Sequence, residues 1–127
     1  MRVAIVGVCA AGKTTLVEGL KEAGFDAYNV AQEHSCIKKF WNRKIPELLI
    51  MIDATLPAIK KRRFVTWDES RLKVQHERLR DARANADLYI QTDFLSKEEV
   101  LQIAINFIRG KSNVRSNNRG FTERSRN

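Results

Sequence analysis

Four short apolar segments alternate with longer amphipathic ones along the chain, and they predict the strands of a sheet. Arg2–Val6 is the first, with V-A-I-V after the arginine, and Phe25–Val30 is the second. Leu48–Ile52 is apolar at every position, which is typical of a strand buried on both faces of a parallel sheet. Asp87–Gln91 is the last. The pattern therefore predicts about four strands.

The segments between these strands carry the periodicity and the end signals of helices. Lys13–Ala23 has its apolar residues on one face, and Gly24 follows it as a helix stop. Ser96-Lys97-Glu98-Glu99 is a capping box that opens a helix over Lys97–Arg109, and we expect Gly110 to end that helix. The remaining predicted helices are Ser35–Arg43, a helix capped by Thr55 that runs to Arg63, and Asp68–Ala86.

The order of these elements is β-α-β-α-β-α-α-β-α, which predicts an α/β fold. We expect a three-layer α/β/α sandwich with a small parallel sheet of about four strands. A single domain is expected over residues 1–110 of the 127. Residues 111–127 are rich in Ser, Asn and Arg. They hold five basic residues against one Glu, +4 of the total +8, so we expect a basic, disordered tail.

The turn after the first strand matches a phosphate-binding loop. Gly7 to Thr14 fits G-x-x-x-x-G-K-[ST] at every fixed position, and it lies between a strand and a helix as this loop requires. Glycines let the backbone approach a phosphate, and the inward N–H groups form an anion nest. We expect Lys13 to neutralise β- and γ-phosphate oxygens and the Thr14 hydroxyl to coordinate Mg²⁺. The expected nucleotide contacts are Gly7, Val8, Cys9, Ala10, Ala11, Gly12, Lys13, Thr14 and Thr15.

This strand, loop and helix resemble those of the P-loop nucleoside and nucleotide kinases and their relatives, whose loop commonly reads GxxGxGK[ST]. The resemblance covers roughly residues 1–109 and is most specific at 3–20. It implies the P-loop NTPase fold, with ATP or another nucleoside triphosphate and Mg²⁺ as ligands. Ala10 departs from the family, which often has a third glycine there. If that position needs a positive φ, alanine costs about 1 kcal/mol.

Asp53 ends the apolar third strand, and the sequence leaves three interpretations of it open. It could be a Walker B aspartate that holds Mg²⁺ directly or through water. It could instead be structural, because Ile52-Asp53-Ala54 and a helix ending in Lys61-Arg62-Arg63 are similar to the later strand and lid-bound helix of nucleotide kinases. In that register Arg62 and Arg63 would approach the transferring phosphoryl group. The third interpretation is a helix cap.

Three further sets of residues are candidates for the site. In deoxynucleoside kinases and related small kinases a glutamate after the second strand acts as a base or orders the metal, and Glu33 is similarly placed; the alternative is a surface glutamate. The segment ADLYIQTD resembles the terminal strand of nucleotide-kinase-like proteins, which implies that Thr92 and Asp93 lie near the nucleobase. Arg71 or Arg78 could stabilise charge in the transition state, or their helix face could simply be solvated.

Composition and charge narrow the class of protein. No apolar run approaches the roughly 20 residues that span a bilayer, and Met1-Arg2 leads into the first strand without a secretory pattern. Cys9 and Cys36 form no disulfide framework. We therefore expect a cytoplasmic protein without a membrane segment. The net charge suits a polyphosphate ligand, and nucleic-acid binding through the tail is an alternative that no base-reading motif supports.

These features predict a compact kinase that binds Mg·ATP and transfers the γ-phosphoryl group to a small, nucleoside-like or nucleotide-like acceptor. The expected catalytic residues are Lys13, Glu33, Arg62 and Arg63, and the expected metal ligands are Thr14, Glu33 and Asp53. The alternative is an NTPase switch or nucleotide sensor without an acceptor. Nucleotide kinases usually carry a helical insertion for the acceptor, but only 23 residues (25–47) precede the third strand here. The acceptor pocket is therefore expected to be minimal, borrowed from another subunit of a homo-oligomer, or lost.

Overall fold

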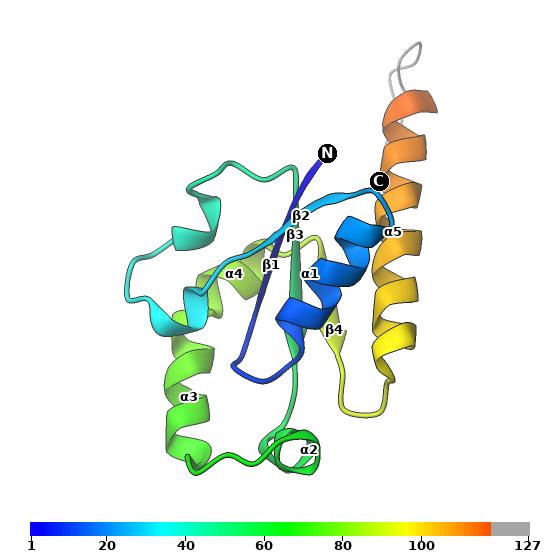
Figure 1. The fold of residues 1–127 in the computed structure, drawn as a ribbon. Coiled ribbons are helices and arrows are strands. Elements are labelled where there is room, and N and C mark those ends of the chain that lie inside the picture. Colours follow the sequence, from blue (N-terminus) through cyan, green and yellow to red (C-terminus); the bar gives the residue numbers. More distant parts are fainter. Residues whose placement is uncertain (118–127) are drawn as a thin grey trace.

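The computed structural model describes residues 1–117, with side chains described through Lys111, and residues 118–127 lie outside the described part. The chain has an α/β fold around a four-stranded sheet (Figure 1). Its strands are β1 (Arg2–Gly7), β2 (Asp26–Asn29), β3 (Leu48–Asp53) and β4 (Leu88–Gln91), in the spatial order β2-β1-β3-β4. Each pairing is parallel, so the predicted α/β class and its four parallel strands are confirmed.

The core lies at the centre of this sheet. Every residue of β3 is buried, and β1 is buried from Val3 onward. In the register of these two strands Val3 pairs with Leu48 and Gly7 with Ile52. Because all four strands run in the same direction, their carboxyl ends meet at one edge of the sheet. The loops that leave this edge are therefore brought together.

Helices cover both faces of the sheet. On one face α1 (Lys13–Glu22) packs against α5 (Lys97–Asn117). On the other, α3 (Glu69–Arg78) leads into α4 (Arg80–Asn85), which packs on β3. The crossovers β1→β2 and β3→β4 advance in opposite directions across the sheet, so right-handed connections place their helices on opposite faces. The short α2 (Leu56–Arg62) lies below the sheet in Figure 1, at the carboxyl edge.

Two helix starts follow their sequence signals. At α2, the Thr55 hydroxyl accepts a hydrogen bond from Ala58 N at 3.4 Å. At α5, Ser96 Oγ accepts from Glu99 N at 3.0 Å, while Glu99 Oε1 accepts from Ser96 N at 2.7 Å. Both predicted caps are confirmed, and the second is a complete capping box.

The helix predicted over Ser35–Arg43 is wrong. The 3₁₀ turn η2 (Phe40–Asn42) lies within this range, another, η1 (Gln32–His34), directly precedes it, and Lys39 between them has a φ of 56°. The side chain of Gln32 holds the segment by donating to Ile37 O and accepting from Trp41 N, each at 2.9 Å. A buried side chain thus satisfies backbone groups that a helix would have paired internally.

Two predicted helix boundaries are also wrong. The helix expected over Asp68–Ala86 is divided at Leu79, which is fully buried and whose ψ of −2° ends α3 before α4 begins. The last helix does not end at Gly110 but continues through Asn117, because Gly110 does not take the positive φ of a glycine stop. The rest of the expected tail, 118–127, lies outside the described residues.

Candidate functional site

The turn between β1 and α1 has a backbone suited to close approach by a ligand. A Cβ atom on Gly7 would lie 2.2 Å from Ile52 O, so no side chain fits where β3 passes. Gly12 has a φ of 104° and precedes α1 without a capping side-chain hydrogen bond, which leaves the helix's first N–H groups facing the loop. Ala10 has a φ of 68°, so the departure from the family pattern falls on a left-handed position.

Lys13, the first residue of α1, folds back over this loop. Its side chain is only 8 % exposed, and its Nζ donates to Gly7 O at 3.0 Å and to Val8 O at 3.1 Å. The same Nζ lies 2.7 Å from Glu33 Oε2. Because a buried ammonium needs a counter-charge, Glu33 balances Lys13 when no ligand is bound.

Glu33 lies in η1, directly beyond β2, and is 3 % exposed, so it is not a surface glutamate. Its Oε2 also lies 3.6 Å from His34 Nε2, and its backbone carbonyl accepts from Arg78 Nη1 at 3.3 Å. Its Oε1 is buried and has no hydrogen-bond partner among the described residues. An orphaned, buried carboxylate oxygen is costly unless a cation or a proton meets it.

Gln75 on α3 is a site residue to which the sequence analysis assigned no role. Its side chain is buried, and its Oε1 accepts from Cys9 N in the Gly7–Thr14 loop at 2.7 Å. The contact joins residues 66 positions apart, so no local sequence motif predicts it. The signal available in the sequence was a glutamine on the same helix face as Arg71 and Arg78.

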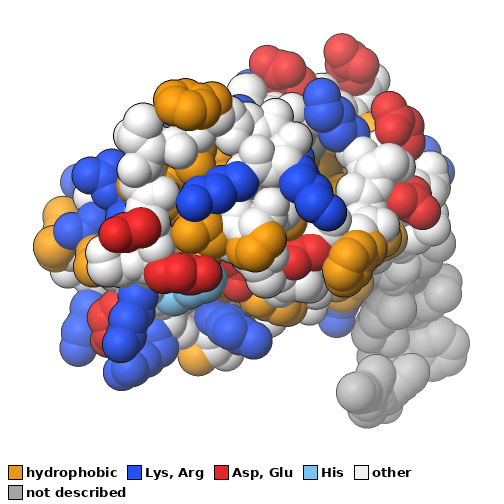
Figure 2. Space-filling view, turned by 90° about the horizontal axis from the view of Figure 1, so that it is seen from below, with side chains coloured by type: hydrophobic (Ala, Val, Ile, Leu, Met, Phe, Trp, Pro, Cys, Tyr) orange, Lys and Arg blue, Asp and Glu red, His pale blue; other side chains and the backbone are white. Residues whose placement is uncertain are grey.

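A cavity of about 320 Å³ opens at the mouth of the loop and brings most of the predicted residues together. It is lined by Cys9, Ala10, Gly12, Lys13, Thr14, Thr15, Asn29, Ala31, Glu33 and Arg63. Val8, which also belongs to this loop, is fully buried and does not line the cavity. Seen from this side, Lys and Arg side chains lie in several groups with Asp and Glu between them (Figure 2). The lining of the cavity itself carries both charge signs, with Lys13 and Arg63 against Glu33.

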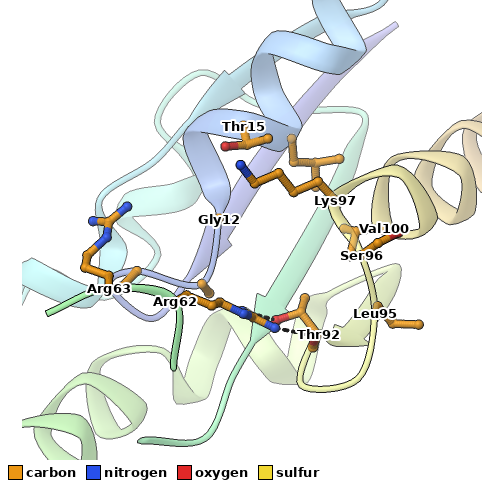
Figure 3. Close-up of a pocket in the computed structure, with 12 residues that line it drawn as sticks. Gly12, Thr15, Arg62, Arg63, Thr92, Leu95, Ser96, Lys97 and Val100 are labelled. Atoms are coloured by element: carbon orange, nitrogen blue, oxygen red, sulfur yellow. Dashed lines mark hydrogen bonds between the residues drawn. The ribbon is translucent and has the colours of Figure 1, made fainter. Parts of the chain in front are cut away.

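A second cavity, of about 330 Å³, lies on the other side of the loop, between the start of α1 and the segment that joins β4 to α5 (Figure 3). Arg62 crosses its floor and donates from Nη1 to Thr92 Oγ1 at 3.0 Å and from Nη2 to Thr92 O. Arg63 points away from Arg62, and it lines both cavities. Ala11, Gly12, Thr15 and Lys97 are also among the lining residues.

Asp53 lies beside the loop, at the end of β3, but its carboxylate is engaged by protein groups. Tyr89 donates its hydroxyl to Oδ2 at 2.6 Å, and His76 Nε2 lies 2.9 Å from Oδ1. Oδ1 also accepts from Ala54 N, whereas the cap of α2 is Thr55. Burial, with the hydrogen bond to Asp53 as a second cause, raises the pKa of Tyr89 to about 12. This arrangement favours a structural role for Asp53 over direct metal coordination.

Asp93 turns toward α2 rather than into either cavity. It accepts from Thr55 N at 3.0 Å, from Thr55 Oγ1 at 2.6 Å and from Gln91 Nε2 at 2.9 Å. Although burial alone would raise the pKa of Asp93, these hydrogen bonds hold it below the ordinary value. Of the two residues expected near a nucleobase, Thr92 lines the second cavity, while Asp93 tethers the turn after β4 to α2.

The described residues contain no cluster of three or more His, Cys, Asp or Glu side chains that could hold a metal ion alone. Within the same part of the chain, no helix has the length and apolarity needed to cross a bilayer. No known protein-family model matches the chain, and no curated protein is significantly similar to it.

Proposed function

We propose that this chain is a P-loop kinase-like protein with the P-loop NTPase fold, which binds Mg·ATP and transfers the γ-phosphoryl group to a small acceptor. The observation that carries the proposal is the position of Lys13. Its ammonium sits at the mouth of a loop of G-x-x-x-x-G-K-T sequence, 2.7 Å from a buried carboxylate of another segment. A surface lysine after a chance turn would not be buried against a counter-charge.

The two cavities suit the two ends of a nucleoside triphosphate. The mouth offers Lys13 and the N-terminal end of α1 to the phosphates, because unpaired N–H groups and the helix dipole favour anions there. The second cavity, with Thr92 and Leu95 on one wall, is within the size range of small-ligand sites and suits the base and sugar. Thr15 lines both cavities, so one molecule could occupy them together.

The residues at the mouth also fit a magnesium ion bound with the nucleotide. Thr14 offers an exposed hydroxyl, and Glu33 offers the buried Oε1 without a partner, both in the same cavity. When bound, Mg²⁺ would supply positive charge to the phosphate oxygens. The structural evidence favours these two residues over Asp53, whose oxygens are engaged by Tyr89, His76 and Ala54 N.

In the transfer step, an acceptor hydroxyl oxygen forms a bond to the γ-phosphorus while the bond from that phosphorus to the β–γ bridging oxygen breaks. ADP leaves with the electron pair of the broken bond, and the acceptor's proton passes to Glu33 Oε2, which becomes free when the Lys13 ammonium turns to the phosphate oxygens. Lys13 and Arg63 stabilise the charge on the phosphate oxygens. Arg62, which is held by Thr92, would have to leave that partner to reach a phosphate, so it is the weaker candidate for direct contact.

The test is product analysis with γ-³²P-labelled ATP, Mg²⁺ and a panel of nucleosides, nucleotides and small alcohols. We expect a labelled acceptor with the wild-type protein and none with Lys13→Ala. Lys21→Ala, an exposed lysine of the same helix, is the matched control and should keep full activity. ADP and free phosphate without a labelled acceptor would support the NTPase switch instead. Calorimetry that detects no uptake of Mg·ATP by the wild-type protein would refute both.

We also infer a reducing, cytoplasmic location. Both cysteines are free in the described part of the chain, and Cys9 lies in the phosphate loop, where oxidation would obstruct a ligand. Cell fractionation of a tagged protein tests this inference.

A further inference from the structure

A third hollow, of about 510 Å³, lies between the end of β2 and the loop that carries η2, and nothing above assigns it a ligand. Three aromatic side chains belong to it: Tyr28 on β2, and Phe40 and Trp41 on η2. All three are partly buried, pack against the core and line the hollow. These walls would accept a flat, aromatic molecule by stacking.

Trp41, which forms one wall of the hollow, is held in place by hydrogen bonds within the protein. Trp41 donates its indole N–H to Asp81 Oδ2 at 2.9 Å, and its backbone N–H to Gln32 Oε1 at 2.9 Å. Gln32 is itself buried, and Asp81 belongs to α4 on the far side of the loop. A side chain fixed at both its ring and its backbone loses little freedom when a ligand binds.

Two cations close the hollow. The guanidinium of Arg43 lies 5.1 Å from the centre of the Phe40 ring, and the ammonium of Lys44 lies 4.9 Å from the centre of the Tyr28 ring. None of the residues described as lining the hollow is acidic, so these cations face no carboxylate there. Their charge therefore suits an anionic substituent on the aromatic molecule.

The hydroxyl of Tyr28 adds a polar group without a partner. Its oxygen is buried, and no hydrogen bond to it is formed by any residue in the described part of the chain. Because buried hydroxyls are normally paired, this group favours a ligand atom that can exchange a hydrogen bond with it.

The hollow adjoins the mouth of the phosphate loop. Asn29 and Ala31 line both cavities, and Glu33 follows two residues later with its carboxylate against Lys13. A molecule in the hollow would therefore have one end close to the point where we expect the γ-phosphate. This neighbourhood favours an acceptor site over an unrelated pocket, and that assignment rests on the proposed function.

We propose that the Tyr28–Trp41 hollow binds the acceptor, and that the acceptor is a planar aromatic ring carrying a phosphate or carboxylate group. The ring stacks on Phe40 and Trp41, and the anionic group is held by Arg43 and Lys44. The segment between β2 and β3 thus supplies from one chain the pocket that the missing insertion supplies in nucleotide kinases. No second subunit is needed to complete it.

The chain provides its own reporter for a binding test. It has two tryptophans, so a Trp67→Phe protein keeps Trp41 as its single fluorophore, directly in the hollow. We would titrate this protein with uridine 5′-monophosphate, adenosine 5′-monophosphate and orotate, which combine a ring with an anion. Uridine supplies the ring alone, and ribose 5-phosphate supplies the anion alone. Orotate against the monophosphates distinguishes a carboxylate from a phosphate.

We expect saturable quenching of Trp41 by at least one ring-plus-anion probe. Removing either part of the probe should weaken binding about tenfold, as should the double substitution Arg43→Gln, Lys44→Gln. Lys38→Gln, an exposed lysine of the same loop outside the hollow, is the matched control and should change nothing. Tyr28→Phe removes only the unpartnered hydroxyl and should weaken binding about threefold. Because this variant keeps both cations, it tests the hollow without removing a charge from the loop.

Two results would overturn the proposal. One is the absence of saturable quenching by all three ring-plus-anion probes in a protein that calorimetry shows to bind Mg·ATP. The other is binding that survives the Arg43, Lys44 double substitution and disappears in Lys13→Ala, since the probe would then occupy the phosphate loop. Failure of the proposed function looks different: calorimetry would detect no Mg·ATP uptake, whatever the fluorescence of Trp41 shows.

Discussion

The buried ion pair between Lys13 and Glu33 should couple the Gly7–Thr14 loop to the segment after β2. The two charged atoms lie 2.7 Å apart, and the residues are 8 % and 3 % exposed. Removing one member of a buried pair leaves an uncompensated charge, which destabilises a protein by about 3–5 kcal/mol. Replacing both members with neutral groups costs much less, because no charge is then left buried. We therefore expect Lys13→Met and Glu33→Gln to be coupled by at least about 2 kcal/mol.

The assay is urea unfolding of the wild type, both single variants and the double variant, followed by circular dichroism. With a slope of about 1–3 kcal/mol per M for a small domain, a loss of 3 kcal/mol lowers the midpoint by about 1–3 M in each single variant. The double variant should recover much of this loss. Glu77 and Arg80 form the control pair: their charged atoms lie 3.0 Å apart, but the side chains are 66 % and 78 % exposed. Their coupling should stay below about 1 kcal/mol. An equal coupling in the two pairs would refute the reasoning, because it would show that burial contributes nothing.

Three further predictions concern groups near the loop. Ala10→Gly should stabilise the protein by about 0.5 kcal/mol in urea unfolding, because relief of the left-handed φ exceeds the added entropy of the unfolded chain. The control Ala11→Gly should destabilise it. A lower stability of Ala10→Gly would contradict the inferred strain at Ala10. Gln75→Leu should speed amide hydrogen exchange at Cys9 and cost about 1–3 kcal/mol, since the Cys9 N–H loses its acceptor; unchanged exchange would contradict this. Because Tyr89 has a pKa raised from 10.0 to about 12, the stability it contributes is fully present below pH 10 and is lost as pH rises toward 12; Tyr89→Phe should flatten that decline in thermal unfolding.

The fold was predictable wherever a short stretch of sequence carries its own physical signal. β3 is the clearest case, since an unbroken apolar run has no stable place except between two covered faces. The capping box at Ser96 and Glu99 is another, because both hydrogen bonds form within one turn. The helix predicted over Ser35–Arg43 failed for the opposite reason. Its backbone is held by Gln32, a residue outside the predicted helix.

The site divides in the same way. The loop from Gly7 to Thr14 is contiguous, so its motif could be read directly, and the structure brings Lys13 and Glu33 together as the strand order implies. Asp53 could not be assigned from sequence, because its partners His76 and Tyr89 come from elements 23 and 36 residues away. Each of the three sequence interpretations described Asp53 by its chain neighbours alone. The contacts of Asp53 with His76 and Tyr89 come from tertiary packing, which no local stretch of sequence contains.

The topology explains how so short a chain can assemble a candidate site. With β1 inside a parallel sheet, the Gly7–Thr14 loop leaves the sheet between the carboxyl ends of β2 and β3. The first of these leads to Glu33, and the second leads through Asp53 and α2 to Arg62 and Arg63. Burial of the core already fixes where each strand ends. The polar residues that follow each strand are therefore positioned at this edge without an additional domain or insertion. A consequence is that changes confined to residues 40–44 should alter binding of the proposed acceptor while leaving binding of the proposed nucleotide intact, because the Gly7–Thr14 loop is held by β1, β3 and Gln75 and by the Glu33 end of this segment.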